Sequence, residues 1–404
     1  MDAKTRLSDL AIFGPPPVFA DALHVGRPNV GNRQALLRRI NDLLDRRWLT
    51  NNGPYVRELE QRIAALIGVR HCVLTSSGTL ALELTIRASG MTGEVIVPAY
   101  TFVATAHALQ WLGITPVFCD IDPQTHNIDP AHLERLLTPR TSGIIGVHLW
   151  GRPCDIEALT QIADRHDLTL LFDAAHAFGC SHRGRMVGGF GLAETFSFHA
   201  TKYFNTFEGG AVTCDDDDLA AKLRLMRNFG FAGLDNVIAL GSNAKMSEIA
   251  AAMGLTLLDE LDALIERNRQ NYHLYRAQLQ DVAGVTLLRY DETAACNYQY
   301  IVLEVEESVT GIGADDLVDV LRAENVFARR YFSPGCHRME PYKSQATEPG
   351  EPHLPATERV AGRVVCLPSG TAVGAPEISA ICDLIRLSVR EGPTLRGRLA
   401  ETRP

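Results

Sequence analysis

Residues 155–176 read DIEALTQIADRHDLTLLFDAAH, and this stretch contains one full unit of the pattern that decides the fold. Asp155 stands at the start of a helical pattern that ends at His166, and the short run Leu168–Phe172 follows directly. This run is almost entirely apolar, which is typical of a strand that helices cover on both faces of a sheet.

The same alternation of short apolar runs and helical stretches extends from residue 70 to residue 213. We expect helices at Leu80–Arg87 and Pro130–Leu137, and further strands at His71–Leu74, Glu94–Val97, Pro116–Cys119, Gly143–Val147, Thr195–Phe198 and Ala211–Thr213. The pattern predicts an α/β fold in which a mostly parallel central sheet forms a large domain.

A smaller α/β domain is predicted beyond a single long helix over Met246–Tyr275. Strands are expected near Gly284–Arg289 and Tyr298–Glu304, and helices near Gly313–Glu324 and Pro376–Glu391. We therefore divide the chain into an N-terminal arm with the first helix (1–54), a large domain (55–265) and a small C-terminal domain (266–404).

The 404 residues are 46% hydrophobic and 22% charged, which suits a globular protein of two or three domains. A net charge of −9 disfavours sequence-independent binding of nucleic acid. No apolar run approaches the length of a membrane span, and the first residues lack a signal-peptide pattern, so we expect a cytoplasmic protein. The nine cysteines form no metal-binding spacing, so we expect buried thiols and no metal.

Three of the expected strands are followed by residues that could bind a ligand or take part in catalysis. Ser77-Gly78-Thr79 opens a helix whose free N–H groups favour a phosphate, although ordinary hydroxyl capping would use the same residues. Asp173 ends an apolar strand, where a carboxylate needs a cationic or hydrogen-bonding partner, although an N-cap is the alternative. Lys202 follows a third strand; a buried lysine can form a Schiff base, whereas an isolated lysine is most often solvated.

Together these three groups fit one cofactor, pyridoxal 5′-phosphate (PLP). Its phosphate needs N–H and hydroxyl donors, its pyridine nitrogen needs an anion in order to stay protonated, and its aldehyde needs an amine. Ligands of open α/β sheets bind beyond the carboxyl ends of the strands, where all three groups are expected. The sequence therefore predicts a PLP site.

With these residues in view, the chain resembles the sugar-nucleotide aminotransferases of PLP fold type I, the DegT/DnrJ/StrS group, over essentially its whole length. The stretches that match are Ser77-Gly78-Thr79, Val97–Phe102, Val147–Gly151, Asp173–His176, Ser197–Lys202 with Glu208-Gly209-Gly210, and Gly241–Met246. The segments Val25–Asn29, Met226–Phe231 and Lys245–Glu248 are most similar to the branch that makes dTDP-4-amino-4,6-dideoxyglucose.

The resemblance implies that Lys202 forms the Schiff base with the cofactor and that Asp173 pairs with its pyridinium nitrogen. Phe102 is expected to stack on the cofactor ring and His176 to donate a hydrogen bond to the ring hydroxyl. For Phe102 and His176, packing in the hydrophobic core is the alternative.

The resemblance also assigns the cofactor phosphate to Ser77, Gly78, Thr79 and Ser197. Asn243 corresponds to a residue that, in the family, reaches the phosphate of the partner subunit's cofactor. We therefore expect a homodimer with shared active sites.

The reaction that the resemblance implies moves an amino group from L-glutamate to C4 of a 4-keto-6-deoxy sugar nucleotide, dTDP-4-keto-6-deoxyglucose. Tyr331 and His337 fall where family members line the sugar site. A 3-keto sugar nucleotide or a ketocyclitol as acceptor would use the same cofactor residues. A non-catalytic PLP-binding regulatory module is an alternative of another class, and a PLP-dependent sugar dehydratase is disfavoured because that branch has histidine where this chain has Lys202.

Overall fold

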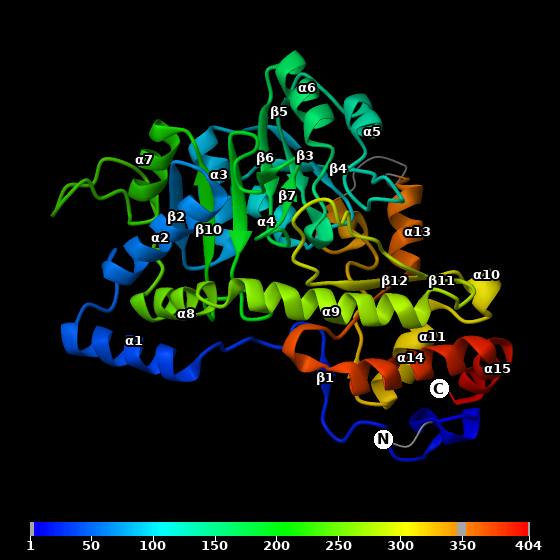
Figure 1. Cartoon of the computed structure of the whole chain (residues 1–404). Helices are drawn as coiled ribbons and strands as arrows, with labels where there is room; N and C mark the ends of the chain where they lie inside the picture. Colours follow the sequence, from blue (N-terminus) through cyan, green and yellow to red (C-terminus); the bar gives the residue numbers. More distant parts are fainter. Residues whose placement is uncertain (1–3, 346–352, 403–404) are drawn as a thin grey trace.

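The computed structural model describes residues 4–345 and 353–402. A seven-stranded sheet forms the upper part of the molecule in Figure 1. Its strands, in spatial order, are β2 (His71–Thr75), β10 (Gly210–Cys214), β9 (Ala193–Ser197), β6 (Thr169–Asp173), β5 (Thr141–Val147), β3 (Glu94–Pro98) and β4 (Thr115–Cys119). Only β10 runs antiparallel to its neighbours in this sheet, so the predicted α/β fold with a mostly parallel sheet is confirmed.

Alternate residues of the central strands pack on opposite faces of the sheet, as expected from the two-residue period of a strand. Ile145 and Leu171 belong to a core with helices α3 (Gly78–Ser89), α4 (Ala104–Trp111) and α7 (Asp217–Met226). Ile144 and Leu170 belong to a core with α5 (Pro130–Arg135) and α6 (Ile156–His166). Helices on both faces explain why these strands are apolar throughout.

The predicted long helix is in fact two helices, α8 (Glu248–Leu258) and α9 (Leu261–Leu279), which lie end to end below the sheet in Figure 1. Between them, Glu260 has backbone angles outside the helical range (φ −116°, ψ 12°). The carboxylate of Asp259 pairs with Arg39 at 2.7 Å and with Arg62 at 2.8 Å. The prediction of a single helix was wrong, and the break coincides with tertiary ion pairs that the local pattern does not contain.

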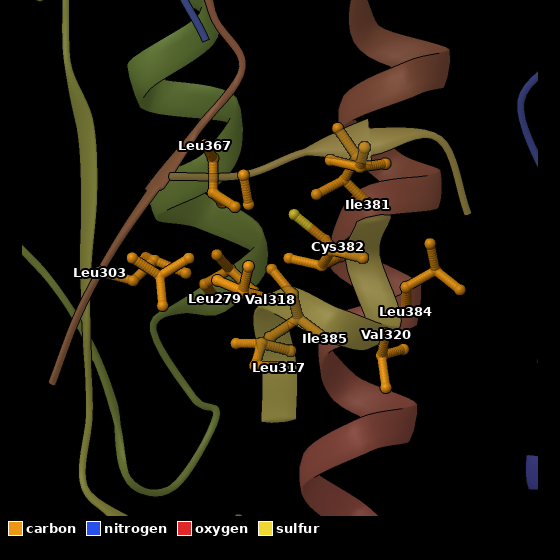
Figure 2. Packing of buried hydrophobic residues seen from close by; sticks show 14 of the residues in the cluster. Leu279, Leu303, Leu317, Val318, Val320, Leu367, Ile381, Cys382, Leu384 and Ile385 are labelled. Atoms are coloured by element: carbon orange, nitrogen blue, oxygen red, sulfur yellow. The ribbon is translucent and has the colours of Figure 1, made fainter. Parts of the chain in front are cut away.

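A second, antiparallel sheet contains β11 (Val285–Leu287), β12 (Ile301–Val305) and β14 (Val364–Leu367). It packs with α9, α11 (Ala314–Ala323) and α14 (Ala375–Arg390) around the hydrophobic core shown in Figure 2, to which Leu279, Leu303, Leu317, Leu367 and Ile385 contribute. The remaining elements here are α10 (Glu307–Thr310), β13 (Val326–Phe327), α12 (Tyr342–Gln345), α13 (Pro355–Arg363) and α15 (Gly392–Thr402). The predicted strands and helices of this region are present, whereas β13, α13, β14 and α15 were not anticipated.

The N-terminal segment lies along the rest of the protein. Its short strand β1 (Leu23–His24) pairs in parallel with β13, and its helix α1 (Arg33–Arg46) packs on α8, while α2 (Pro54–Ile67) packs on α8 and β2. The buried carboxylate of Glu324 accepts hydrogen bonds from Lys4 Nζ and from the backbone N–H groups of Ala11 and Val18. The boundaries at residues 54 and 265 stay a prediction.

Within the described residues, no helix is both long and apolar enough to cross a bilayer, and no group of three or more His, Cys, Asp or Glu side chains could hold a metal ion. Eight of the nine cysteines are buried, and Cys296 is partly exposed.

Candidate active site

The predicted phosphate loop packs against two neighbouring strands of the large sheet. A Cβ at Gly78 would lie 2.7 Å from the Cβ of Ser197 at the end of β9, and a Cβ at Gly210 would lie 2.6 Å from the carbonyl oxygen of Ser77. Both distances are too short for any side chain, so glycine is required at both positions. The loop therefore reaches Ser197, as the prediction requires.

The hydrogen-bonding groups of this loop suit an anion. Ser77 is the N-cap of α3, where its Oγ accepts a hydrogen bond from Leu80 N at 3.1 Å. The first N–H groups of a helix have no partner within the helix, and they lie at the positive end of its dipole. Gly78 and Thr79 supply such N–H groups beside the Ser197 hydroxyl. The capping role and the phosphate role of Ser77 are therefore compatible.

Asp173 ends β6 with only 6% of its surface exposed. Its carboxylate accepts hydrogen bonds from Thr105 Oγ1 at 2.8 Å and from Ala175 N at 3.0 Å. Burial raises the pKa of the Asp173 carboxyl, while these two hydrogen bonds and the charge of Lys202 act in the opposite direction. No cationic side chain in the described parts of the chain forms an ion pair with it. A buried carboxylate of this kind is stabilised by a cationic partner such as a pyridinium nitrogen.

Lys202 follows β9 and is half-buried. Its Nζ donates a hydrogen bond to Tyr300 Oη at 3.0 Å. Burial lowers the pKa of the Lys202 amine to about 8, and the negative charge of Asp173 opposes this shift. At pH 7 roughly a tenth of such an amine is unprotonated, far more than for a lysine with its ordinary pKa, and the unprotonated amine is the form that attacks an aldehyde.

His176 lies between aromatic rings, with 7% of its surface exposed. Its Nδ1 accepts a hydrogen bond from the backbone N–H of Trp150 at 3.2 Å, and its ring packs on Tyr300 with centroids 4.4 Å apart. Burial, together with the charge of Lys202, holds the pKa of His176 well below its usual value. The neutral ring then carries its proton on Nε2, which can donate a hydrogen bond to a ring hydroxyl.

Phe102 is 57% exposed, which is unusual for a large aromatic side chain beside a buried strand end. Its ring centroid lies 6.3 Å from that of Phe332. An exposed ring of this kind can stack on a planar cofactor. Phe102 therefore does not belong to the hydrophobic core, which was the alternative role for this residue.

The two predicted sugar-site residues differ in their surroundings. Tyr331 is half-buried, with the Arg329 guanidinium 5.0 Å from its ring centroid. His337 is 5% exposed, and neither ring nitrogen has a hydrogen-bond partner in the described structure, although Glu358 Oε1 lies 3.5 Å from Nε2. Burial lowers the pKa of His337, and Glu358 opposes this shift.

Asn243 is exposed, on a segment that meets the phosphate loop of the same chain: Ser76 N donates to Ala244 O at 2.8 Å, and Thr75 forms an isolated β-bridge with Lys245. Whether Asn243 reaches a second chain stays a prediction. Sequence reasoning missed Thr105 and Tyr300, which come from α4 and from the residue before β12. Their contacts with Asp173 and Lys202 are long-range, and no local motif marked them.

The set as a whole fits PLP. It combines an anion site at a helix N-terminus, a buried carboxylate that has no ion-pair partner among the described residues, an amine with a lowered pKa, a neutral histidine N–H and an exposed aromatic ring.

Comparison with known proteins gives matches over nearly the whole chain. A model of the DegT/DnrJ/EryC1/StrS aminotransferase family matches residues 32–386. A dTDP-4-amino-4,6-dideoxy-D-glucose transaminase of Shigella dysenteriae is 37% identical over 92% of this chain and 98% of its own length. A GDP-perosamine synthase of Caulobacter vibrioides is 36% identical over 76% of this chain and 84% of its own.

Solved structures agree with these matches. The crystal structure of DesI, determined in the presence of its TDP-sugar product, is 52% identical, covers 98% of this chain and 100% of its own, and superposes with a TM-score of 0.93. The PLP form of Spr1654 from Streptococcus pneumoniae, described as a putative sugar aminotransferase, is 25% identical, covers 92% of this chain and 99% of its own, and has a TM-score of 0.83.

Proposed function

The chain belongs to the DegT/DnrJ/EryC1/StrS aminotransferase family, and we propose that it transfers the amino group of L-glutamate to C4 of dTDP-4-keto-6-deoxyglucose. It is a PLP-dependent transaminase, so the alternative of a non-catalytic regulatory module is not retained. The observation that carries the choice of acceptor is the 37% identity, over 92% of this chain, to a dTDP-4-amino-4,6-dideoxy-D-glucose transaminase. The match to DesI, a structure determined with a TDP-sugar product, at 52% identity over 98% of this chain supports the nucleotide.

We assign the cofactor contacts as follows. Lys202 binds the aldehyde, Asp173 faces the pyridinium nitrogen, His176 donates to the ring hydroxyl and Phe102 stacks on the ring. Ser77, Gly78, Thr79 and Ser197 hold the phosphate. Bound PLP supplies an electron sink that stabilises negative charge on the carbon from which a proton is removed.

Lys202 is the acid and base of both half-reactions. Its Nζ takes the proton from Cα of the amino donor in the first half, and delivers a proton to C4 of the sugar in the second. An amine whose pKa lies at about 8 can do both near neutral pH, because neither protonation state is strongly disfavoured. Asp173, held ionised by Thr105 and Ala175, keeps the electron sink effective.

The active unit that we propose is a homodimer. Residues 229–240 expose Phe229, Phe231, Leu234, Val237, Ile238 and Leu240, with Leu234 97% exposed. This segment extends beyond α7 in Figure 1. So many exposed apolar side chains in one segment are typical of an interface. Asn243 lies three residues after Leu240, the last residue of this exposed apolar segment. Its position beside the proposed interface supports a contact with the partner's cofactor phosphate. Tyr331 and His337 are proposed to contact the sugar.

The test of the acceptor uses a panel of keto compounds. Enzyme converted to the amine form of its cofactor with L-glutamate is mixed with 4-keto-6-deoxy sugars linked to dTDP, UDP and GDP, a dTDP-linked 3-keto-6-deoxy sugar and a ketocyclitol. We expect the aldehyde form of the cofactor, followed by its absorbance, to reappear fastest with dTDP-4-keto-6-deoxyglucose. NMR of the product should show an amine at C4 of the sugar. Faster turnover of the 3-keto sugar or the ketocyclitol would replace the proposal with that alternative.

A further inference from the structure

The amine of Lys202 has a hydrogen-bond partner from the other sheet of the molecule. Lys202 follows β9 of the seven-stranded sheet, whereas Tyr300 directly precedes β12 of the three-stranded sheet. Nζ donates to Tyr300 Oη at 3.0 Å and lies 5.7 Å from the centroid of the ring. The hydroxyl therefore touches the one atom of this chain on which the proposed proton transfers depend.

Tyr300 is held on all sides, so that its hydroxyl occupies a defined place. The residue is 7% exposed, and its ring packs on His176 at 4.4 Å and on Trp150 at 5.3 Å between centroids. Its backbone is fixed by Tyr290, whose Oη lies 2.9 Å from the carbonyl oxygen of Tyr300 and 3.1 Å from that of Trp150. Because the surrounding contacts fix the ring, the hydroxyl is pre-positioned for the amine.

The Tyr300 hydroxyl is uncharged, so it does not fix the protonation state of the Lys202 amine, which must gain and lose a proton. Burial raises the pKa of Tyr300 well above 10, so the phenol stays protonated in the working range. A carboxylate in its place would hold Lys202 as an ammonium ion through charge attraction. A phenol orients the amine by a hydrogen bond and leaves it able to titrate.

We propose that Tyr300 is a positioning residue for Lys202, whose hydroxyl holds Nζ in place while the amine is not bound to cofactor or substrate. When the Nζ lone pair takes the proton from the substrate carbon, a C–H bond breaks and an N–H bond forms. The resulting ammonium donates one hydrogen to Tyr300 Oη and keeps the others for return to a carbon. This role rests on the function of Lys202 proposed above.

The test measures Lys202 itself in the protein freed of cofactor. Reductive methylation with formaldehyde and cyanoborohydride is run from pH 6 to pH 10, and the peptide that contains Lys202 is quantified by mass spectrometry. The variant is Tyr300→Phe, which keeps the ring and removes the hydroxyl. The matched control is Tyr298→Phe, which removes the hydroxyl of a buried tyrosine two residues away.

In Tyr300→Phe we expect the midpoint of Lys202 reactivity to fall by roughly one pH unit, because the ammonium loses a hydrogen-bond acceptor. In the holoenzyme, kcat should fall roughly tenfold to a hundredfold with little change in KM for the sugar, since a displaced amine costs rate and not binding. Tyr298→Phe should leave the midpoint and kcat unchanged.

An unchanged midpoint in folded Tyr300→Phe overturns the proposal, whatever happens to kcat. Thermal unfolding establishes that the variant is folded. If it is not, 4-fluorophenylalanine at position 300 keeps the size of the ring and replaces the hydroxyl by a weak, non-titrating acceptor, and the midpoint should then fall as expected for Tyr300→Phe. The midpoint is read without cofactor, so a failure of the transaminase proposal leaves this result interpretable.

Discussion

Thr105 Oγ1 lies 2.8 Å from Asp173 Oδ2, and this hydrogen bond joins the first turn of α4 to the carboxyl end of β6. Both residues are buried, Thr105 completely. A buried carboxylate stays ionised only where donors or cations compensate for lost water. The fold supplies two donors at this site, Thr105 Oγ1 and Ala175 N, and of these only the hydroxyl can be removed by substitution.

Thr105→Val should therefore raise the pKa of Asp173 further. Activity that needs the ionised carboxylate is lost as the pH falls through that pKa, so the acid limb of kcat/KM should move to higher pH, by roughly half a unit to one unit. The measurement is a pH–rate profile between pH 5 and pH 9. Thr85→Val is the matched control, because its buried hydroxyl donates to Ala81 O within α3. An acid limb that stays in place would show that Thr105 does not support the carboxylate.

Asp173→Asn replaces the carboxylate by a neutral group of the same shape. An amide cannot hold the pyridine nitrogen protonated, so the electron sink is lost while the phosphate seat and the amine remain. We expect the variant to retain some cofactor and to lose at least about a hundredfold in kcat, a loss of roughly 3 kcal/mol in transition-state stabilisation. Absorbance measures cofactor content, and single-turnover kinetics measure the rate. A rate near that of the wild type contradicts the role assigned to Asp173.

Lys202→Ala removes the amine that we propose binds the aldehyde. In the wild-type protein, borohydride should attach the cofactor to the peptide that contains Lys202, and in Lys202→Ala no peptide should be labelled. Turnover should fall by a factor of about a thousand or more, since we assign to the same amine the acid and base roles of both half-reactions. Lys222→Ala, an exposed lysine on α7, is the control and should be labelled at Lys202 as usual. Label on another lysine would refute the assignment.

The sequence predicts the parts of the site that parallel strands bring together. Asp173, Ser197 and the Ser77 loop each follow a strand of one sheet, so their meeting follows from topology alone. Thr105 and Tyr300 approach from a helix face and from another sheet, and their contacts depend on tertiary packing. The three-dimensional arrangement of the elements is needed to identify them.

Two of the features of the fold that the sequence analysis did not predict have a similar explanation. The break between α8 and α9 coincides with ion pairs from Asp259 to Arg39 and Arg62, which lie about two hundred residues earlier in the chain. Strand β14 is the four-residue run Val364–Leu367, which continues directly from α13. An apolar run of that length is equally compatible with a strand and with the last turn of a buried helix. Pairing with β12 makes it a strand.

The shared active site can be tested by mixing two inactive chains. If Asn243 completes the partner's site, a heterodimer of Lys202→Ala and Asn243→Asp chains contains one site with a wild-type Lys202 and a wild-type Asn243. Random pairing makes half of the dimers mixed, and each mixed dimer has one of its two sites intact. The unfractionated mixture should therefore recover about a quarter of wild-type activity, and the purified mixed dimer about half. The chains are co-expressed with different tags, and the mixed dimer is purified through both.

The control for this experiment is the pair Lys202→Ala and Asp173→Asn. Both residues lie in the site of one chain, with the charge of Lys202 acting on Asp173, so no mixed dimer of these variants contains an intact site and activity should stay at the level of the single variants. If the Asn243→Asp pair recovers no more activity than this control, each chain completes its own site and the role of Asn243 across the interface is wrong. Recovery in the first pair alone requires that two chains build one site.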